Sequence, residues 1–172
     1  MHGLAQREGA ITSHTRYQKK IFNDPRKDLQ SPLISYGDAD LYICLEPVEA
    51  LRRGIFASNK TSFAVNSHTI PGVMITAKLE EYPELGQIES TLKTYSDDVY
   101  FMDATKLSLD HFNQNQQMNL IMLGFAIVLG KIPYIAIKNY EAMIREHLSN
   151  PDINIEALDL GIQEGRKLIK KK

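Results

Sequence analysis

The stretch Leu41-Tyr42-Ile43-Cys44-Leu45-Glu46-Pro47-Val48-Glu49-Ala50-Leu51-Arg52-Arg53-Gly54 decides the fold, because it passes directly from a strand pattern to a helix pattern. Five apolar residues in succession, 41–45, predict a short strand buried on both faces. Pro47 stops this strand and suits the first turn of a helix over residues 48–53, which Gly54 ends. A buried strand followed at once by a helix is typical of a parallel α/β sheet.

The same alternation of apolar strands and amphipathic or apolar helices extends along the chain on both sides of this stretch. Residues 18–32 carry charges, two prolines and an Asn-Asp-Pro turn, so we expect an exposed excursion there. The patterns predict further strands at residues 10–17, 62–65, 73–77 and 99–102, and further helices at residues 83–95, 118–129, 138–148 and 155–169. We therefore expect an α/β fold, a three-layer α/β/α sandwich with a Rossmann-like sheet, in a single domain over residues 1–172.

The composition excludes several classes of partner. A formal net charge of −1 gives no reason to expect nucleic acid or an anionic membrane surface as a partner. The strongest apolar stretch, residues 118–129, is much shorter than the roughly 20 residues that a membrane span needs. The chain also lacks a basic segment followed by an apolar one at its start, which a signal peptide would show. We expect a cytoplasmic location.

The reactive side chains do not form a self-sufficient active site in the sequence. The only cysteine, Cys44, lies inside the apolar run, so a buried inert thiol is favoured over a reactive one. The five histidines lack the spacing of metal ligands, and we expect no metal site. Neither G-x-G-x-x-G nor G-x-x-x-x-G-K-S/T occurs, so the usual phosphate-binding loops are missing. We assign no catalytic residue to this chain.

Polar side chains stand where the predicted strands end. Glu46, Asn66 and Asp103 each follow a strand, and ligands of α/β folds bind beyond the carboxyl ends of strands. Simpler roles are also open: Glu46 and Glu49 as charges favoured at a helix N-terminus, and Asp103 as a helix cap. Asn119, in the first turn of the most apolar helix, either ties down a neighbouring loop or faces a ligand.

The first nine residues look like a functional loop. His2, Gln6 and Arg7 lie between Gly3 and Gly9, and glycine allows close approach of the backbone to a ligand or partner. Gln6 supplies hydrogen-bond donors, and the planar guanidinium of Arg7 suits a carboxylate or phosphate. Such a loop is expected after a strand, although this chain begins with it.

Several segments, taken together and in order, resemble one family. Residues 2–9 with Ser13-His14 and Arg16 are similar to H-G-M/L-A-Q-R-x-G…S-H-x-R of the beta subunit of indolepyruvate ferredoxin oxidoreductase. The later segments that fit this family are residues 37–41 and 45–52 (G-x-A-D-L…E-P-x-E-A-L-R), Asn66 with Ile70-Pro71 (N-x-x-x-I-P), residues 103–105 (D-A-T), and Asn119 with residues 122–124 (N-x-x-M-L-G). The resemblance covers nearly the whole chain.

The resemblance implies a gamma-type domain of the 2-oxoacid:ferredoxin oxidoreductases. It implies oxidative decarboxylation of an aryl 2-oxoacid such as indolepyruvate to an acyl-coenzyme A, with electrons passing to ferredoxin. The partner is then a large catalytic alpha subunit, which carries thiamine diphosphate and the iron–sulfur clusters. This chain would bind no cofactor alone, in keeping with its single cysteine, since a cluster takes four thiolates.

One departure from the family pattern concerns the start of the chain. Members of the family usually begin with a strand, a G-x-G-G-Q-G turn and a helix, and this sequence lacks that unit. Either Met1 is an internal methionine taken as the start, or the protein has lost this unit. Such a loss would leave a sheet edge and apolar helix faces uncovered, so we expect a homo-oligomer when the chain is alone, or attachment to a partner. Glu8 also stands where glycine is common in the family.

Two hypotheses follow. In the first, the chain is an enzyme subunit: Gln6 and Arg7 face the partner's active-site region and help to hold substrate or coenzyme A, and His2, Glu46, Asn66 and Asn119 are second-rank candidates for the same surface. Equally open is a role of Gln6 and Arg7 only in bonding across the subunit interface. In the second hypothesis, the chain is a stand-alone homo-oligomeric binding domain derived from the family.

Overall fold

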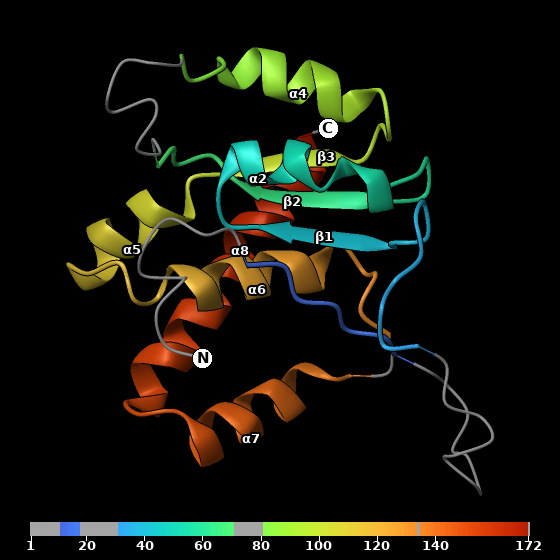
Figure 1. Cartoon of the computed structure of the whole chain (residues 1–172). Helices are drawn as coiled ribbons and strands as arrows, with labels where there is room; N and C mark the ends of the chain where they lie inside the picture. The colour runs from blue at the N-terminus through green and yellow to red at the C-terminus, as the bar shows by residue number, and fades with distance from the viewer. Residues whose placement is uncertain (1–10, 18–30, 71–80, 134, 172) are drawn as a thin grey trace, which may run out of the picture.

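The structure is a computed structural model that describes residues 11–17, 31–70, 81–133 and 135–171. Three parallel strands form its sheet in the order β1-β2-β3 (Figure 1). These strands are β1 (Leu41–Cys44), β2 (Ser62–Asn66) and β3 (Val99–Met102), with Leu41 opposite Ser62 and Phe63 opposite Val99. Every residue of the central strand β2 is buried.

Helices cover both faces of this sheet, so the three-layer prediction is confirmed. Figure 1 shows α2 (Pro47–Arg52) and α4 (Leu85–Lys93) on one face and α6 (Met118–Val128) on the other. Alternate residues of β2 pack into two hydrophobic clusters, one on each face of the sheet. Phe63 and Val65 pack with Ile88 and Leu92 on one face, and Ala64 packs with residues of α6 on the other.

The last helix, α8 (Pro151–Lys171), lies behind α6 and packs along it. The approach is close because glycines occupy the contact. A Cβ atom at Gly161 would overlap the carbonyl oxygen of Ile121, and one at Gly124 would overlap that of Leu158. Backbone therefore meets backbone at this crossing, and only glycine fits there.

The remaining elements are short. A 3₁₀ helix (Gly54–Phe56) follows α2, α5 (Ala104–Phe112) follows β3, and α7 (Ile137–His147) packs through the buried Ile144 into the cluster around α8. The predicted helices all form, although α8 begins earlier than expected, at Pro151. None of the helices in the described part of the chain is long and apolar enough to cross a membrane.

Two sequence predictions about strands need correction. Residues 11–17 form no strand; this segment instead contacts the 31–34 loop, where the backbone amide of Ile34 donates to His14 Nδ1 over 3.1 Å. The stretch 41–45 is not buried on both faces either, because β1 is the end strand of the described sheet and Ile43 and Leu45 are exposed. The strand expected at residues 73–77 and residues 18–30 of the expected excursion lie outside the described residues.

Candidate functional site at the carboxyl edge of the sheet

The carboxyl ends of the three strands lie side by side and bring distant sequence segments together. The amide of Ser67, just after β2, donates to the carbonyl oxygen of Met102 at the end of β3 over 3.0 Å. β1 pairs with β2 up to Cys44 opposite Val65, so Glu46 follows at the same edge. The sequence prediction that Glu46, Asn66 and Asp103 share one edge of the sheet is confirmed.

Asn66 joins the three strand ends through its buried side-chain amide. Its Nδ2 donates to the carbonyl oxygen of Leu45 (3.1 Å) and to Thr105 Oγ1 (2.9 Å), while its Oδ1 accepts from the amide of Ala104 (3.0 Å). The residue is fully buried. A buried amide has to be satisfied, and here the strand ends satisfy it. Asn66 therefore has a positioning role at this edge, and its place on a surface that faces substrate or partner stays a prediction.

Glu46 is held at the start of α2 by both of its carboxylate oxygens. Oε2 accepts from the backbone amide of Glu49 over 3.1 Å, which caps the helix, and Oε1 accepts from the hydroxyl of Tyr82. The helix N-terminus favours negative charge, so the N-terminal role considered for Glu46 is confirmed. Glu46 is half-buried and so keeps some surface at the edge.

Sequence reasoning missed Tyr82, which lies in the polar run before α4 and carries no motif. Burial raises the pKa of the Tyr82 hydroxyl, and its hydrogen bond to the Glu46 carboxylate raises it further. Tyr82 is therefore a neutral donor that fixes the Glu46 side chain.

The structure confirms the capping role considered for Asp103 and shows where Asn119 lies. Asp103 caps α5, because its Oδ1 accepts from the amide of Lys106 over 2.8 Å. Asn119 is exposed in the first turn of α6, and its place on a ligand-facing surface stays a prediction. The buried polar residue at this turn is Gln117 instead, and its Oε1 has no hydrogen-bond partner in the described structure. His2, Gln6 and Arg7 lie outside the described residues.

Cys44 lies under this edge as an unreactive thiol. The residue is buried and free, and burial raises the pKa of its thiol to about 12, with the carboxylates of Glu46 and Glu49 adding to the shift. A thiol that stays protonated is a poor nucleophile and metal ligand. With one cysteine in the sequence, the residues of this chain do not fit an iron–sulfur cluster held by four thiolates. Within the described ranges, no group of three or more His, Cys, Asp or Glu side chains could hold a metal ion.

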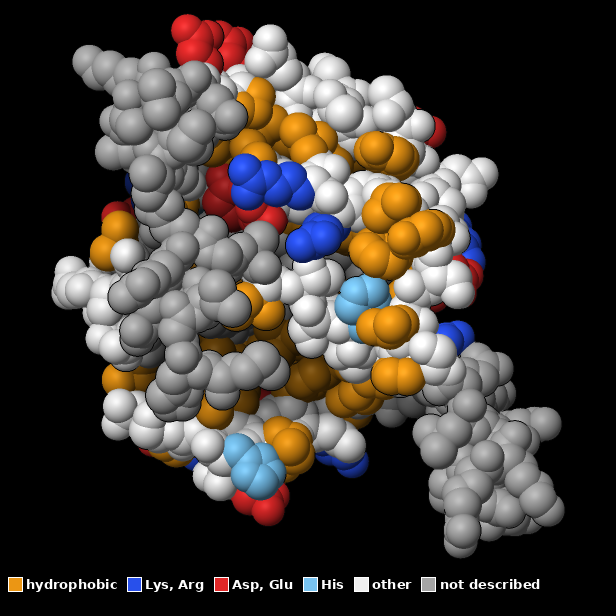
Figure 2. Space-filling view, in the orientation of Figure 1, with side chains coloured by type: hydrophobic (Ala, Val, Ile, Leu, Met, Phe, Trp, Pro, Cys, Tyr) orange, Lys and Arg blue, Asp and Glu red, His pale blue; other side chains and the backbone are white. Residues whose placement is uncertain are grey.

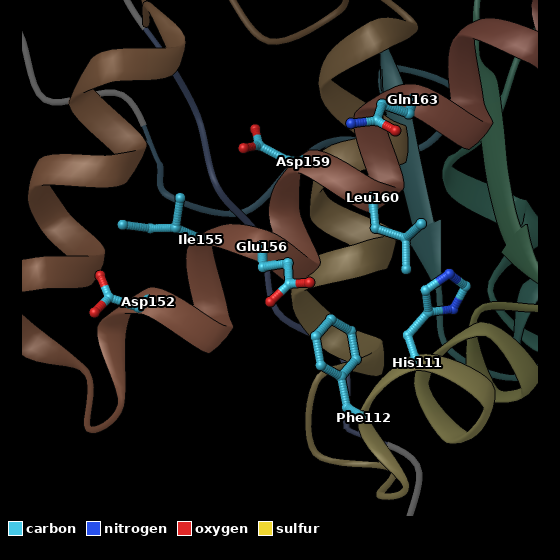
Figure 3. Close-up of a pocket in the computed structure, with 8 residues that line it drawn as sticks. All are labelled: His111, Phe112, Asp152, Ile155, Glu156, Asp159, Leu160 and Gln163. Carbon is cyan, nitrogen blue, oxygen red and sulfur yellow. The ribbon is translucent and has the colours of Figure 1, made fainter.

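A pocket of about 450 Å³ lies elsewhere, between the end of α5 and the first half of α8 (Figure 3). Its apolar lining comes from Phe112, Ile155 and Leu160. The polar lining residues are His111, Asp152, Glu156, Asp159 and Gln163. Of the residues predicted for the functional site, the three that the structure describes, Glu46, Asn66 and Asn119, do not line it.

The comparisons with known proteins agree on one family. Residues 1–164 match the family described as pyruvate ferredoxin/flavodoxin oxidoreductase. The chain is 30% identical over 165 residues to the indolepyruvate oxidoreductase subunit IorB of Archaeoglobus fulgidus, covering 95% of this chain and 77% of the relative. The subunit of the same name from Pyrococcus horikoshii is 28% identical over 174 residues, covering 98% of this chain and 80% of the relative.

A third relative with this name, from Methanothermobacter thermautotrophicus, is 26% identical over 159 residues, covering 91% of this chain and 76% of the relative. No solved structure matches the chain significantly. The two segments joined by the hydrogen bonds of Asn66, at the ends of β2 and β3, both lie within the residues that match the family. The chain belongs to the pyruvate ferredoxin/flavodoxin oxidoreductase family.

Proposed function

We propose that this chain is the smaller subunit of a 2-oxoacid:ferredoxin oxidoreductase that acts on indolepyruvate or a related aryl 2-oxoacid. In this reaction the oxoacid is decarboxylated, its acyl group is transferred to coenzyme A, and electrons pass to ferredoxin. The observation that carries the proposal is that relatives from several organisms bear the same name, indolepyruvate oxidoreductase subunit IorB.

The architecture of the carboxyl edge supports a binding role without catalysis by this chain alone. Asn66 and Tyr82 hold this edge through hydrogen bonds to Leu45 and Glu46, and Glu46 is half-buried and His68 exposed there. A surface with hydrogen-bonded supports is preorganised for a partner, which lowers the cost of binding. The thiamine diphosphate and the iron–sulfur clusters belong, in this proposal, to the larger catalytic subunit, which supplies the decarboxylation and electron-transfer chemistry.

The N-terminal residues complete the proposed surface. Gln6 and Arg7 face the active-site region of the larger subunit, where the Arg7 guanidinium holds an anionic group of the substrate or coenzyme A. His2, Glu46 and Asn119 contribute to the same surface. Asn66 acts through the residues that it positions.

Co-expression with the larger subunit tests the proposal. The two chains are expected to co-purify and to reduce ferredoxin in the presence of indolepyruvate and coenzyme A. Loss of a charge-assisted hydrogen bond costs about 1.5–3 kcal/mol, so Arg7→Ala is expected to lower kcat/KM by roughly 10- to 100-fold. Lys93→Ala, an exposed change at the far end of α4, serves as the control and should leave kcat/KM unchanged.

Two outcomes would overturn parts of the proposal. Full activity and assembly of Arg7→Ala would remove the role of the N-terminal loop. Failure of the two chains to associate would favour the stand-alone binding domain.

A further inference from the structure

The exposed side of α8 carries opposite charges at its two ends. Six side chains lie on this side at intervals of three or four residues, which places them on one face of a helix. We name this row the α8 charge stripe: Asp152, Glu156, Asp159, Gln163, Arg166 and Lys170. All are exposed except Asp159, which is half-buried. The stripe lies opposite Gly161, the residue in backbone contact with α6, and therefore points away from α6.

Four charges of the stripe have no partner among the described residues. Glu156 and Asp159 make no ion pair there, and neither do Arg166 and Lys170. At the outer end, Asp152 pairs with Arg145 of α7 over 2.9 Å. The helix dipole favours acidic residues in the first turn and basic residues in the last. Asp159 lies near the middle of the helix, where this dipole effect has faded, so the dipole alone does not account for the stripe.

The stripe is complementary to itself when two copies run antiparallel. A two-fold axis at Gln163 places Glu156 of one copy opposite Lys170 of the other. The same axis places Asp159 within one residue of Arg166, about 1.5 Å along the helix, and each contact occurs twice, as a C2 interface requires. The stripe spans about 27 Å at 1.5 Å per residue, a length over which two helices can pack side by side.

The acidic half of the stripe also has room for the other copy. Figure 3 shows Glu156 and Leu160 of α8 beside Phe112 and His111 of α5, and Asp159 and Gln163 also line this pocket of about 450 Å³. Phe112 and Leu160 give the pocket an apolar lining, against which the aliphatic stems of basic side chains can pack while their charges reach the carboxylates. An apolar lining with a carboxylate rim fits the basic end of a second α8.

We propose that this chain forms a symmetric homodimer through antiparallel contact of the α8 charge stripes. The contact surface differs from the carboxyl edge assigned to the larger subunit, and the proposal does not depend on the proposed function. It assigns the lysine-rich end of the chain, which composition alone suggests is merely solvated, to an interface.

Paired charge reversals test the dimer by analytical ultracentrifugation of the purified chain. The wild-type chain is expected to sediment at twice the 19.5 kDa chain mass in dilute buffer. Glu156→Lys/Asp159→Lys makes the stripe basic throughout, and Arg166→Glu/Lys170→Glu makes it acidic. Each variant alone is expected to be monomeric through self-repulsion, and an equimolar mixture of the two is expected to form a heterodimer.

The control carries the same charge change at exposed positions away from the stripe. Glu81→Lys/Glu146→Lys should remain a dimer like the wild type. Raising the salt from about 0.1 M to 1 M shortens the Debye length from about 10 to 3 Å and should weaken the wild-type dimer. This measurement at high salt uses only the wild-type chain, so it does not depend on whether the variants fold. A monomeric wild type, a salt-insensitive dimer, or a mixture of the two variants that stays monomeric would each overturn the proposal.

Discussion

Asn66 Nδ2 lies 2.9 Å from Thr105 Oγ1, and this buried hydrogen bond links the end of β2 to the start of α5. The two residues are 39 positions apart in the chain and belong to two motifs that the sequence shows only as separate signals. Their contact joins the two motifs, because the Asn66 side-chain amide bonds to the carbonyl of Leu45 and the amide of Ala104 just beyond the paired strands. The carboxyl edge is thus a hydrogen-bonded unit, and it should respond to mutation as one.

Replacing Asn66 should destabilise the protein strongly. Asn66→Leu leaves the carbonyl of Leu45, the amide of Ala104 and the hydroxyl of Thr105 without their partner. Each buried unsatisfied group costs about 1–3 kcal/mol, so we expect the free energy of unfolding in urea to fall by roughly 3–5 kcal/mol. Asn59→Ala, an exposed change before β2, should shift it by less than about 0.5 kcal/mol. Similar effects of the two changes would contradict the role assigned to Asn66.

Glycine-to-alanine substitution should have opposite effects on stability at Gly161, in the crossing of α6 and α8, and at Gly86, in α4. Gly161→Ala places a methyl group against the backbone of Ile121, so the helices must separate. We expect a loss of about 1–3 kcal/mol or more in the free energy of unfolding. Gly86→Ala in α4 meets no atom within 4 Å and should stabilise by up to about 1 kcal/mol, since alanine favours the helix. Thermal unfolding monitored by circular dichroism measures both, and a tolerated Gly161→Ala would contradict the close crossing.

The hydroxyl of Tyr82 predicts a loss of stability at alkaline pH. Its pKa is raised above the ordinary value of 10.0 in the folded state, so the folded protein holds this proton more tightly than the unfolded chain does. The resulting stabilisation is fully present below pH 10 and declines as the pH rises above that value. In Tyr82→Phe the fall in unfolding free energy above pH 10 should therefore be less steep.

Tyr42 provides the comparison for this prediction. Burial raises the pKa of Tyr42 to about 12, and Tyr42→Phe should also flatten the alkaline limb, but without disturbing the Glu46 carboxylate. If the alkaline limb of Tyr82→Phe coincided with that of the wild type, the hydrogen bond from Tyr82 to Glu46 would be in doubt.

Cys44 should be inert in the folded protein and reactive in the unfolded chain. Its side chain is buried and its thiol pKa is about 12, so little thiolate exists near neutral pH. A coloured disulfide reagent should label Cys44 slowly in native buffer and rapidly in concentrated urea, where the pKa returns toward its ordinary value. Rapid labelling of the native protein would show that the β1 end is open.

Local patterns along the chain predict most of the elements, because strand and helix periods are local properties. The short runs at residues 41–45 and 62–65 predict strands, and the capping role considered for Asp103 appears in the structure. The pattern of residues 10–17 is misleading, since a β-branched segment forms a strand only where a neighbouring strand can pair with it.

The burial of individual side chains and their hydrogen-bond partners are harder to predict from the sequence, because both depend on tertiary contacts. The exposure of Ile43 follows from the position of β1 at the end of the sheet, which no local pattern encodes. Asn119 and Gln117 stand two residues apart, and their opposite burial depends on how the first turn of α6 meets its neighbours. Tyr82 has no motif at all, and only the fold brings its hydroxyl to Glu46.

Reconstitution from separately purified chains tests the central claim, that this chain is a subunit of a larger 2-oxoacid oxidoreductase. The purified chain is titrated into the larger subunit, which is prepared with its cofactors, and indolepyruvate-dependent reduction of ferredoxin is followed. The account predicts that activity is low for either chain alone and rises to a plateau at a fixed stoichiometric ratio of the two chains. A larger subunit that is fully active alone, with no change on addition of this chain, would contradict it.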